Sequence, residues 1–422
     1  MRKRGSRLFI LLLIAALGVF VCLAAARKRN KDAKVPVCLN KTLTNEMSDT
    51  SDLHGLDAQI RKYMQEWNLH GASLTIMKND SLVYAKGYGE ADDGVEMGPG
   101  TILRVASVSK LITAIGIMTL EEQGLLDIDD KVFDEGGLLS GYSDVIKDKR
   151  MFDITIRHLL MHQAGFTTRA GDPMFNTRDL ISIYKWDGPP DSATLARKIL
   201  SRKLGFAPGS GSDYSNFGYL LLSMVIENAT GMEYEEWMQE NVLKKAGCLD
   251  AHLAFNYYED KFPNETRYYL QNNDKEIPCY DGSGALKPRC YGGNDIRALK
   301  GAGAWVISTP ELAKLVASVD GRQEVPDILS EESVKAMTFV TDSVTYALGW
   351  NDISKDGIWT RTGTLSGTSA LIKYYPDGEC WIMVTNTSTW RGPYFTKWTS
   401  SLFRRLREKY SDKLPQRDFF YR

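Results

Sequence analysis

The chain has 422 residues, with 43% hydrophobic and 25% charged side chains, ordinary proportions for a globular protein that buries a sizeable core. Its 52 basic and 53 acidic side chains leave a formal net charge of −1. This balance argues against a nucleic-acid-binding protein, which usually shows a basic surplus or patch.

The first 34 residues carry the pattern of a signal peptide or a membrane anchor. Four basic residues precede an apolar run over residues 8–26, which ends in three alanines. A basic start, an apolar stretch and small residues are typical of an export signal, and a run of 19 residues is also long enough to span a bilayer. Cleavage and retention as an anchor both fit this pattern. We therefore expect an extracytoplasmic protein that is periplasmic, secreted or anchored in the membrane facing outward.

Composition divides the rest of the chain into three parts. Polar residues over 35–55 predict a linker, residues 56–410 hold the elements of one large domain with two lobes, and residues 411–422 form a C-terminal tail. Within the domain, apolar residues near helical spacing predict a first helix over Leu56–Trp67.

Two strand-like runs follow this helix. They cover residues 72–77 and 82–88 and are separated by the turn-forming sequence Lys78-Asn79-Asp80. Apolar runs joined by such a short turn predict a β-hairpin.

The middle of the chain, to about residue 250, is rich in predicted helices. One starts near Ser107 and runs through LITAIGIMTLEEQGLL, which is apolar on nearly every face and therefore predicts a buried helix. Another follows a loop around Pro208, runs through FGYLLLSMVIENATG and ends near Gly231.

Residues 251–298 are polar, aromatic and loop-like. They hold Cys279 and Cys290, which are close enough in the sequence to pair in an oxidising compartment. The alternative is two free thiols, and the five cysteines outside the apolar run do not support a full disulfide framework.

The last third of the chain predicts strands and two helices. The sequence GAGAWVISTPELAKLVASV suggests a turn, a short strand and a helix. Strands follow around Ile358–Thr362, Ser369–Tyr375 and Trp381–Thr385, and Asp377-Gly378 is a plausible turn between the last two. An amphipathic helix over 394–410 closes the domain.

Strands at both ends of the domain therefore flank a helical middle. The simplest arrangement is an α+β fold, in which one antiparallel sheet is built from both ends of the domain and an all-helical lobe is inserted. A ligand site is then expected between the two lobes.

The first candidate for chemistry is Ser107-Val108-Ser109-Lys110. Ser107 and Lys110 are three residues apart and share one face of a helix. A serine hydroxyl becomes a nucleophile when a base removes its proton, and a lysine desolvated by an apolar helix has a lowered pKa that suits this role. The tetrapeptide is common by chance, and in isolation it more often marks a helix cap and a solvated lysine.

The second candidate is Tyr214-Ser215-Asn216, in the loop before the second buried helix. A tyrosine beside a lysine can move protons, and asparagine offers both a donor and an acceptor for orienting a lysine or a substrate amide. The alternative is an aromatic loop residue followed by an asparagine helix cap.

The third candidate is Arg361-Thr362-Gly363-Thr364, on a late strand. A glycine lets a substrate approach the strand closely, a cation beside it can bind a carboxylate, and the backbone N–H of Thr364 can bind an acyl oxygen. The alternative is a strand end followed by a turn.

His158 and His162 lie four residues apart and could bind zinc from one helix face. The residues between them are Leu159, Leu160 and Met161, without the glutamate of a zinc hydrolase. We therefore expect structural roles for both histidines, no metal site and no cofactor.

The three motifs, in this order, resemble those of the serine β-lactamase and penicillin-binding-protein family. The resemblance extends over roughly residues 57–405. It includes ILRVASVSKLITAIGIMTLEEQGLLDIDDKV, ITIRHLLMHQAGF and FAPGSGSDYSNFGYLLLSMVIENATGMEYEEWM, the last two similar to segments of the class C-like branch. It implies a β-lactamase/transpeptidase-like fold and acyl-enzyme chemistry.

The resemblance also implies a role for each motif residue. Ser107 would attack a carbonyl carbon, Lys110 and Tyr214 would share general acid–base work, and Asn216 would orient Lys110 and the substrate. The N–H groups of Ser107 and Thr364 would form the oxyanion hole.

Arg361 departs from the family pattern, which usually has lysine or histidine at this position. Arginine can bind a substrate carboxylate but cannot exchange a proton near neutral pH, which puts β-lactamase activity in doubt.

The resemblance predicts an exported serine hydrolase that acts on an amide or ester, as a D,D-peptidase, an esterase or a β-lactamase-like enzyme. The alternative is a penicillin-binding or sensing module that is acylated but turns over slowly or not at all. The expected partner is a small-molecule or peptide substrate with an acyl group, such as a cell-wall peptide, and no nucleic acid is expected.

Overall fold

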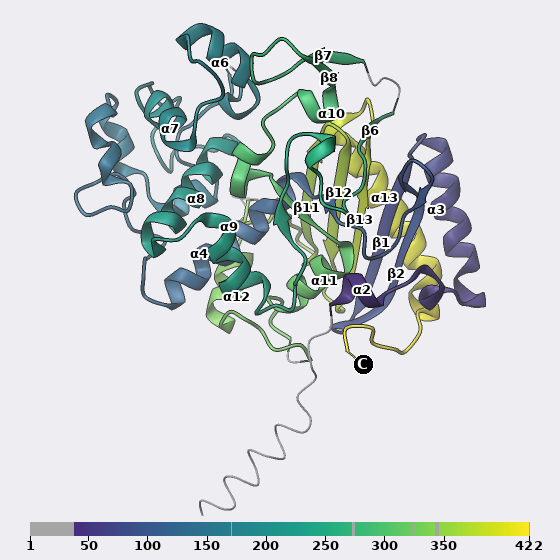
Figure 1. Cartoon of the computed structure of the whole chain (residues 1–422). Helices are drawn as coiled ribbons and strands as arrows, with labels where there is room; N and C mark the ends of the chain where they lie inside the picture. The colour runs from purple at the N-terminus through teal and green to yellow at the C-terminus, as the bar shows by residue number, and fades with distance from the viewer. Residues whose placement is uncertain (1–37, 170, 272–274, 323, 342–345, 422) are drawn as a thin grey trace, which may run out of the picture. The chain divides into compact units, whose positions relative to one another are not determined.

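Strands from both ends of the domain form one seven-stranded antiparallel sheet (Figure 1). The structure, a computed structural model, describes residues 38–169, 171–271, 275–322, 324–341 and 346–421. The strand order is β10-β11-β12-β13-β1-β2-β3, so the first strand pairs with one of the last. The bounds are β1 (Gly71–Lys78), β2 (Ser81–Asp92), β3 (Val95–Glu96), β10 (Asp352–Ile353), β11 (Trp359–Leu365), β12 (Thr368–Tyr374) and β13 (Glu379–Thr385).

Helices fill the chain between and around these strands, which confirms the α+β prediction. Their bounds are α2 (Leu39–Thr42), α3 (His54–Glu66), α4 (Ser109–Glu122), α5 (Ile156–Leu160), α6 (Thr177–Tyr184), α7 (Ser192–Leu200), α8 (Asn216–Thr230), α9 (Tyr234–Met238), α10 (Arg289–Gly292), α11 (Thr309–Ala317), α12 (Glu331–Thr338) and α13 (Thr396–Tyr410). The chain's contacts divide it into two units, of which Cys38–Phe419 carries all of these elements.

The β1–β2 hairpin is confirmed at the predicted turn. Asn79 and Asp80 have φ angles of 48° and 55°. Two consecutive residues with positive φ make the turn that matches the twist of a tight hairpin, and asparagine and aspartate tolerate this conformation better than other side chains.

The two faces of the sheet are covered by different helices, because side chains alternate along a strand. Leu74 and Ile76 of β1 belong to the apolar core under α3 and α13. Ser73 and Thr75 point to the opposite face, where their hydroxyls lie 2.7 and 2.8 Å from the hydroxyl of Thr309 in α11.

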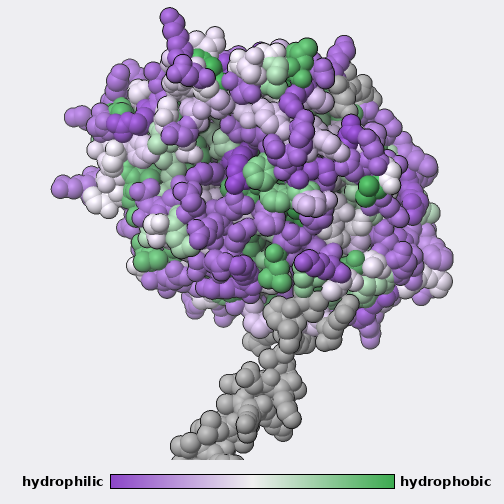
Figure 2. Space-filling model, in the orientation of Figure 1, coloured by the Kyte–Doolittle hydropathy of each residue, from purple (hydrophilic) through white to green (hydrophobic). Residues whose placement is uncertain are grey.

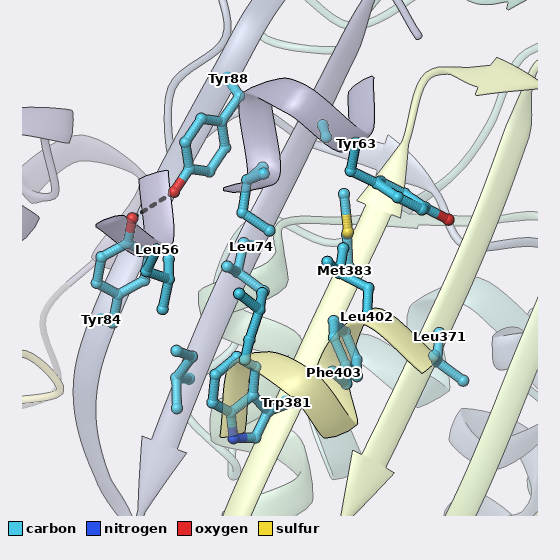
Figure 3. Packing of buried hydrophobic residues seen from close by; sticks show 14 of the residues in the cluster. Leu56, Tyr63, Leu74, Tyr84, Tyr88, Leu371, Trp381, Met383, Leu402 and Phe403 are labelled. Atoms are coloured by element: carbon cyan, nitrogen blue, oxygen red, sulfur yellow. Dashed lines mark hydrogen bonds between the residues drawn. The ribbon is translucent and has the colours of Figure 1, made fainter. Parts of the chain in front are cut away.

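The core under α3 and α13 joins the two ends of the domain (Figure 3). Leu56 of α3 packs in the same cluster as Leu402 and Phe403 of α13, with Leu74 and Trp381 between them from the sheet. The Trp381 and Phe403 rings are 5.6 Å apart, centre to centre.

The helical lobe is built around α4 and α8, and the two predicted buried helices are confirmed. Every residue of α4 from Ser109 to Leu120 is buried, as is the first part of α8 from Asn216 to Ile226. Helix α8 ends at Thr230, and the next residue, Gly231, has a φ of 69°, the left-handed conformation that commonly stops a helix.

The predicted loop-like insertion over 251–298 contains only short elements. Its strands are β5 (His252–Leu253), β6 (Tyr269–Leu270), β7 (Glu276–Pro278) and β8 (Leu286–Pro288), and it also contains α10. Strand β7 pairs with β8, β6 pairs with β14 (Thr387–Ser388), and β5 pairs with β9 (Trp305–Ile307), whose other neighbour is β4 (Leu103–Arg104). Cys279 and Cys290 are both buried, and the structure records both as thiols.

The described part of the predicted linker is packed against the sheet rather than free of it. The Ser48 hydroxyl donates to the Ala85 carbonyl at 2.8 Å and accepts the Ala85 N–H at 2.9 Å. Leu39 and Leu53 are each 1% exposed. A few buried contacts therefore hold a segment whose overall composition is polar.

The C-terminal tail also follows the sheet. The N–H of Phe419 donates to the Leu82 carbonyl at 2.9 Å, and the N–H of Leu82 donates to Asp418 at 3.0 Å.

The predicted signal or anchor, residues 1–34, lies outside the described residues. Within the part that the structure describes, no helix is both long enough and apolar enough to cross a membrane. The face seen in Figure 2 is mainly hydrophilic, and hydrophobic residues appear on it as scattered groups. The extracytoplasmic location stays a prediction.

Candidate active site

Ser107 lies in a short 3-10 turn, η3 (Ala106–Val108), between β4 and α4. The residue before it, Ala106, has a φ of 50°, a backbone conformation that residues other than glycine adopt at a cost. Strand β11 passes this turn very closely. A β-carbon on Gly363 would lie 3.0 Å from the backbone nitrogen of Ser107, so glycine is what allows this approach.

Lys110 lies in the first turn of α4 and its side chain is fully buried. Its Nζ is 2.6 Å from Asn216 Oδ1, 2.6 Å from the Ala302 carbonyl oxygen and 3.4 Å from Ser107 Oγ. An amide oxygen and a carbonyl oxygen can only accept hydrogen bonds. When the Lys110 amine is neutral, its two N–H groups donate to these two oxygens. The lone pair of the nitrogen is then directed at the Ser107 hydroxyl.

Burial lowers the pKa of Lys110 well below its usual value, because the charged form has lost its water. The nearby guanidinium of Arg361 lowers this pKa further, whereas the carboxylate of Asp172 raises it. The site therefore favours the neutral amine, which is the form that can accept a proton from serine.

Asn216, the first residue of α8, is held by a partner that the sequence did not reveal. Its Nδ2 donates to Asp172 Oδ2 at 2.6 Å, which fixes the amide so that Oδ1 faces Lys110. The helix cap is Ser215, whose hydroxyl accepts the N–H of Gly218 at 3.0 Å. Asp172 is in a distant loop, and no local pattern connects it to α8.

Tyr214 lies beside Ser107 and is supported by a buried histidine. Burial raises the Tyr214 pKa, whereas hydrogen bonds with Ser107 and Arg361 and the charge of Arg361 oppose the rise. The phenol is therefore protonated near neutral pH. The His162 ring packs on the Tyr214 ring at 4.4 Å between centres, and its Nδ1 accepts the N–H of Ser215 at 3.2 Å.

His162 is a structural residue in this arrangement. Burial lowers the pKa of His162 well below its usual value, and the charge of Arg361 lowers it further, so the ring is neutral. His158 has a separate role, because its Nδ1 accepts the N–H of Thr155 at the start of α5. Helix α5 ends at Leu160, so the two histidines do not share a helix face.

Arg361 does not take the position expected of a carboxylate-binding residue. It is 1% exposed, and its Nε donates to the Ser107 carbonyl oxygen at 2.9 Å while Nη2 donates to the same oxygen. Arg361 and Gly363 lie on the same face of β11, the face that packs on η3. The guanidinium thus supports the backbone of the serine.

Thr362 and Thr364 lie on the edge of the sheet beside Ser107. The N–H of Thr362 donates to Asn351 Oδ1 at 2.7 Å, away from β12. Alternate N–H groups of a strand point the same way, so the N–H of Thr364 also points away from β12. Strand β10 pairs only with Trp359 and Thr360, which leaves this N–H at an unpaired stretch of the edge.

The side chains of the three motifs therefore meet around Ser107. The arrangement supplies a hydroxyl, a buried amine directed at it, a protonated phenol and a strand N–H at an open edge. In the described residues, no group of three or more histidine, cysteine, aspartate or glutamate side chains is arranged to hold a metal ion.

Comparisons with known proteins show which family and fold the chain is similar to. The sequence profile of the Beta-lactamase family matches residues 56–402. A putative penicillin-binding protein, PbpX of Bacillus subtilis, is 24% identical over 401 residues, covering 90% of this chain and 88% of that protein. Protein flp of Staphylococcus aureus is 23% identical over 334 residues, or 78% of this chain. The chain spans only 62% of the length of flp.

Solved structures show the same fold. D-amino acid amidase from Ochrobactrum anthropi superposes with a TM-score of 0.66 at 18% identity, covering 86% of this chain and 99% of that one. The octameric penicillin-binding protein homologue from Pyrococcus abyssi gives a TM-score of 0.60 at 23% identity, covering 86% and 81%.

Proposed function

The chain belongs to the β-lactamase family, and we propose that it is a serine hydrolase that cleaves an amide or ester through an acyl-enzyme at Ser107. The observation that carries this proposal is the environment of Lys110. The fully buried amine donates to two oxygens that can only accept hydrogen bonds, each at 2.6 Å, and its third neighbour is Ser107 Oγ. This is the arrangement that a general base for serine requires.

Acylation begins when Lys110 Nζ takes the proton of the Ser107 hydroxyl. Oγ then forms a bond to the substrate's carbonyl carbon, and the negative charge moves to the carbonyl oxygen. The N–H groups of Ser107 and Thr364 would bind this oxygen, and loss of one such donor costs about 3 kcal/mol in other hydrolases.

The intermediate collapses when the bond to the leaving oxygen or nitrogen breaks. Tyr214, protonated near neutral pH, is placed to give that atom a proton and to regain one from Lys110. Water then attacks the acyl carbon, Ser107 leaves as the hydroxyl, and the product acid departs. Export, with residues 1–34 as signal or anchor, remains part of this proposal.

The test mixes the full chain with a fluorescent penicillin, a chromogenic cephalosporin and a short-chain nitrophenyl ester. Two quantities are measured with each compound: its rate of hydrolysis and the intact mass of the protein. We expect turnover of at least one substrate and a mass gain that maps to Ser107. Ser107→Ala should lose both, whereas Ser210→Ala, at an exposed loop position, should keep both. Mass gain without turnover would instead support a penicillin-sensing module, and full activity of Ser107→Ala would refute the proposed mechanism.

A further inference from the structure

The two cations nearest Ser107 are not available to an anionic substrate. Arg361 is nearly fully buried, and its Nε and Nη2 both donate to the Ser107 carbonyl oxygen. This Nε–Nη2 edge is one of the edges with which a guanidinium binds a carboxylate bidentately. Lys110 is fully buried and already has three oxygen partners.

Two partly exposed carboxylates, those of Asp172 and Asp213, belong to residues next to or bonded to the site residues. Asp172 is tied to the lysine through Asn216, and its charge acts on both Lys110 and Tyr214. Asp213 directly precedes Tyr214, and its carboxylate accepts the N–H of Thr168 at 3.4 Å.

Neither carboxylate is neutralised by an ion pair among the residues that the structure describes. The hydrogen-bond partners of both carboxylates are backbone or amide N–H groups, which carry no net charge. Asp172 Oδ1, for example, accepts the N–H of Met174 at 2.9 Å. A substrate at Ser107 therefore meets negative charge that the protein has not compensated, while the positive charge is turned inward.

From this distribution we propose, on the basis of the proposed function, that the enzyme's substrates are esters or amides that are neutral or cationic near the scissile bond. A carboxylate there is repelled by Asp172 and Asp213 and finds no free guanidinium. An ammonium group is attracted by the same two side chains. The reaction itself is unchanged: Ser107 Oγ adds to the carbonyl carbon, the ester or amide bond then breaks as the leaving group takes a proton, and water later releases the acid.

The proposal is tested with three nitrophenyl esters whose acyl chains have equal length and end in a methyl, a trimethylammonium or a carboxylate group. The measurement is kcat/KM at low ionic strength, where charge effects are least screened. We expect the trimethylammonium ester to equal or exceed the methyl ester, and the carboxylate ester to be slower by about tenfold or more, as expected for a charge placed within a few ångströms of another.

Asp172→Asn should lower the ratio of kcat/KM for the cationic ester over the anionic ester by about tenfold. Asp213→Asn should also lower this ratio. A ratio between two substrates is independent of any loss common to both, so damage to Asn216 or Lys110 does not imitate this result. Arg361→Gln serves as the matched comparison and should slow all three esters alike.

The inference is overturned if the carboxylate ester is hydrolysed as well as the methyl ester, or if neither aspartate variant changes the ratio. A selective loss of the carboxylate ester in Arg361→Gln would also overturn it, because Arg361 would then be a carboxylate-binding residue. Absence of turnover and of acylation at Ser107 with all three esters would instead refute the proposed function itself, and the substrate assignment with it.

Discussion

The position that a β-carbon would take on Gly363 lies 2.2 Å from the carbonyl oxygen of Val105, two residues before the nucleophile. Gly363→Ala must therefore push β11 away from η3. Displacement of a reacting group by about 1 Å typically costs about a hundredfold in rate, and we expect acylation of Ser107 to fall at least that far. The measurement is the acylation rate by intact mass.

Gly141→Ala is the control for this prediction, because a β-carbon at Gly141 meets no atom within 4 Å. It should acylate at the wild-type rate. A Gly363→Ala protein that is folded by circular dichroism and acylates at a normal rate would show that the close approach of β11 is not required.

The pH dependence of acylation should report the protonation of Lys110. A base must be deprotonated to act, so the rate rises with pH and levels off once the amine is neutral. Because burial lowers the Lys110 pKa, this rise should be centred well below the usual lysine value of 10.5. Stopped-flow acylation across a range of pH measures it.

Substitution of the two charged neighbours should move this rise in opposite directions. The Asp172 carboxylate raises the Lys110 pKa and the Arg361 guanidinium lowers it. Asp172→Asn should therefore shift the rise to lower pH, and Arg361→Gln should shift it to higher pH. Shifts in the same direction, or none, would show that Lys110 is not the group that titrates.

A buried acid pair at the β1–β2 turn should make stability depend on pH. Asp80 is 1% exposed, and burial together with the neighbouring Asp320 raises its pKa from 3.8 to about 8. The folded protein therefore holds a proton that the unfolded chain releases, and this stabilisation, complete below pH 3.8, is lost as pH rises towards 8.

Asp80→Asn removes this titration and keeps a side chain that tolerates the left-handed backbone of the turn. Its free energy of unfolding, relative to wild type, should rise with pH by up to about 1.4 kcal/mol per pH unit. Urea unfolding at several pH values measures the difference. Asp356→Asn, at an exposed position, should show no such trend; a flat difference for Asp80→Asn would contradict the raised pKa of Asp80.

The packing of α13 on the sheet should dominate the stability of the strand-rich part. Phe403 is 0% exposed and lies against Trp381, so Phe403→Ala should lower the free energy of unfolding by about 3–5 kcal/mol. Phe339→Ala, at a side chain that is 69% exposed, should change it by less than about 0.5 kcal/mol. Equal effects in denaturant unfolding would be inconsistent with this core.

The sequence predicted those elements whose residues repeat a strong local pattern. The unbroken apolar run of α4 required burial on every face, and Asn79-Asp80 marked a hairpin turn by its own chemistry. The segment over 35–55 was predicted as a linker from its polar composition, which averages over the four buried residues in its described part, Leu39, Leu43, Ser48 and Leu53.

The motifs indicated the candidate site residues, but not the partners that orient them. Ser107, Lys110 and Asn216 lie together, whereas nothing in the sequence near Asp172 or Ala302 signals that Asp172 binds Asn216 or that the Ala302 carbonyl accepts from Lys110. The carboxylate-binding role predicted for Arg361 considered its charge without its direction, and in the structure the guanidinium donates to the Ser107 carbonyl oxygen. Strand alternation offered the missing signal, since Arg361 and Gly363 are two apart and must face η3 together.

The pairing of β1 with β13 has a consequence for how the chain reaches its native state. These neighbours in the centre of the sheet are separated by about 300 residues, so their contacts close a very long loop. Contacts of high sequence separation slow folding, and domains larger than about 150 residues commonly pass through intermediates. During synthesis the β1–β2 hairpin and the helices of the lobe emerge first, while the edge of β1 stays unpaired until almost the whole chain has left the ribosome. That interval is when the nascent protein is most exposed to aggregation.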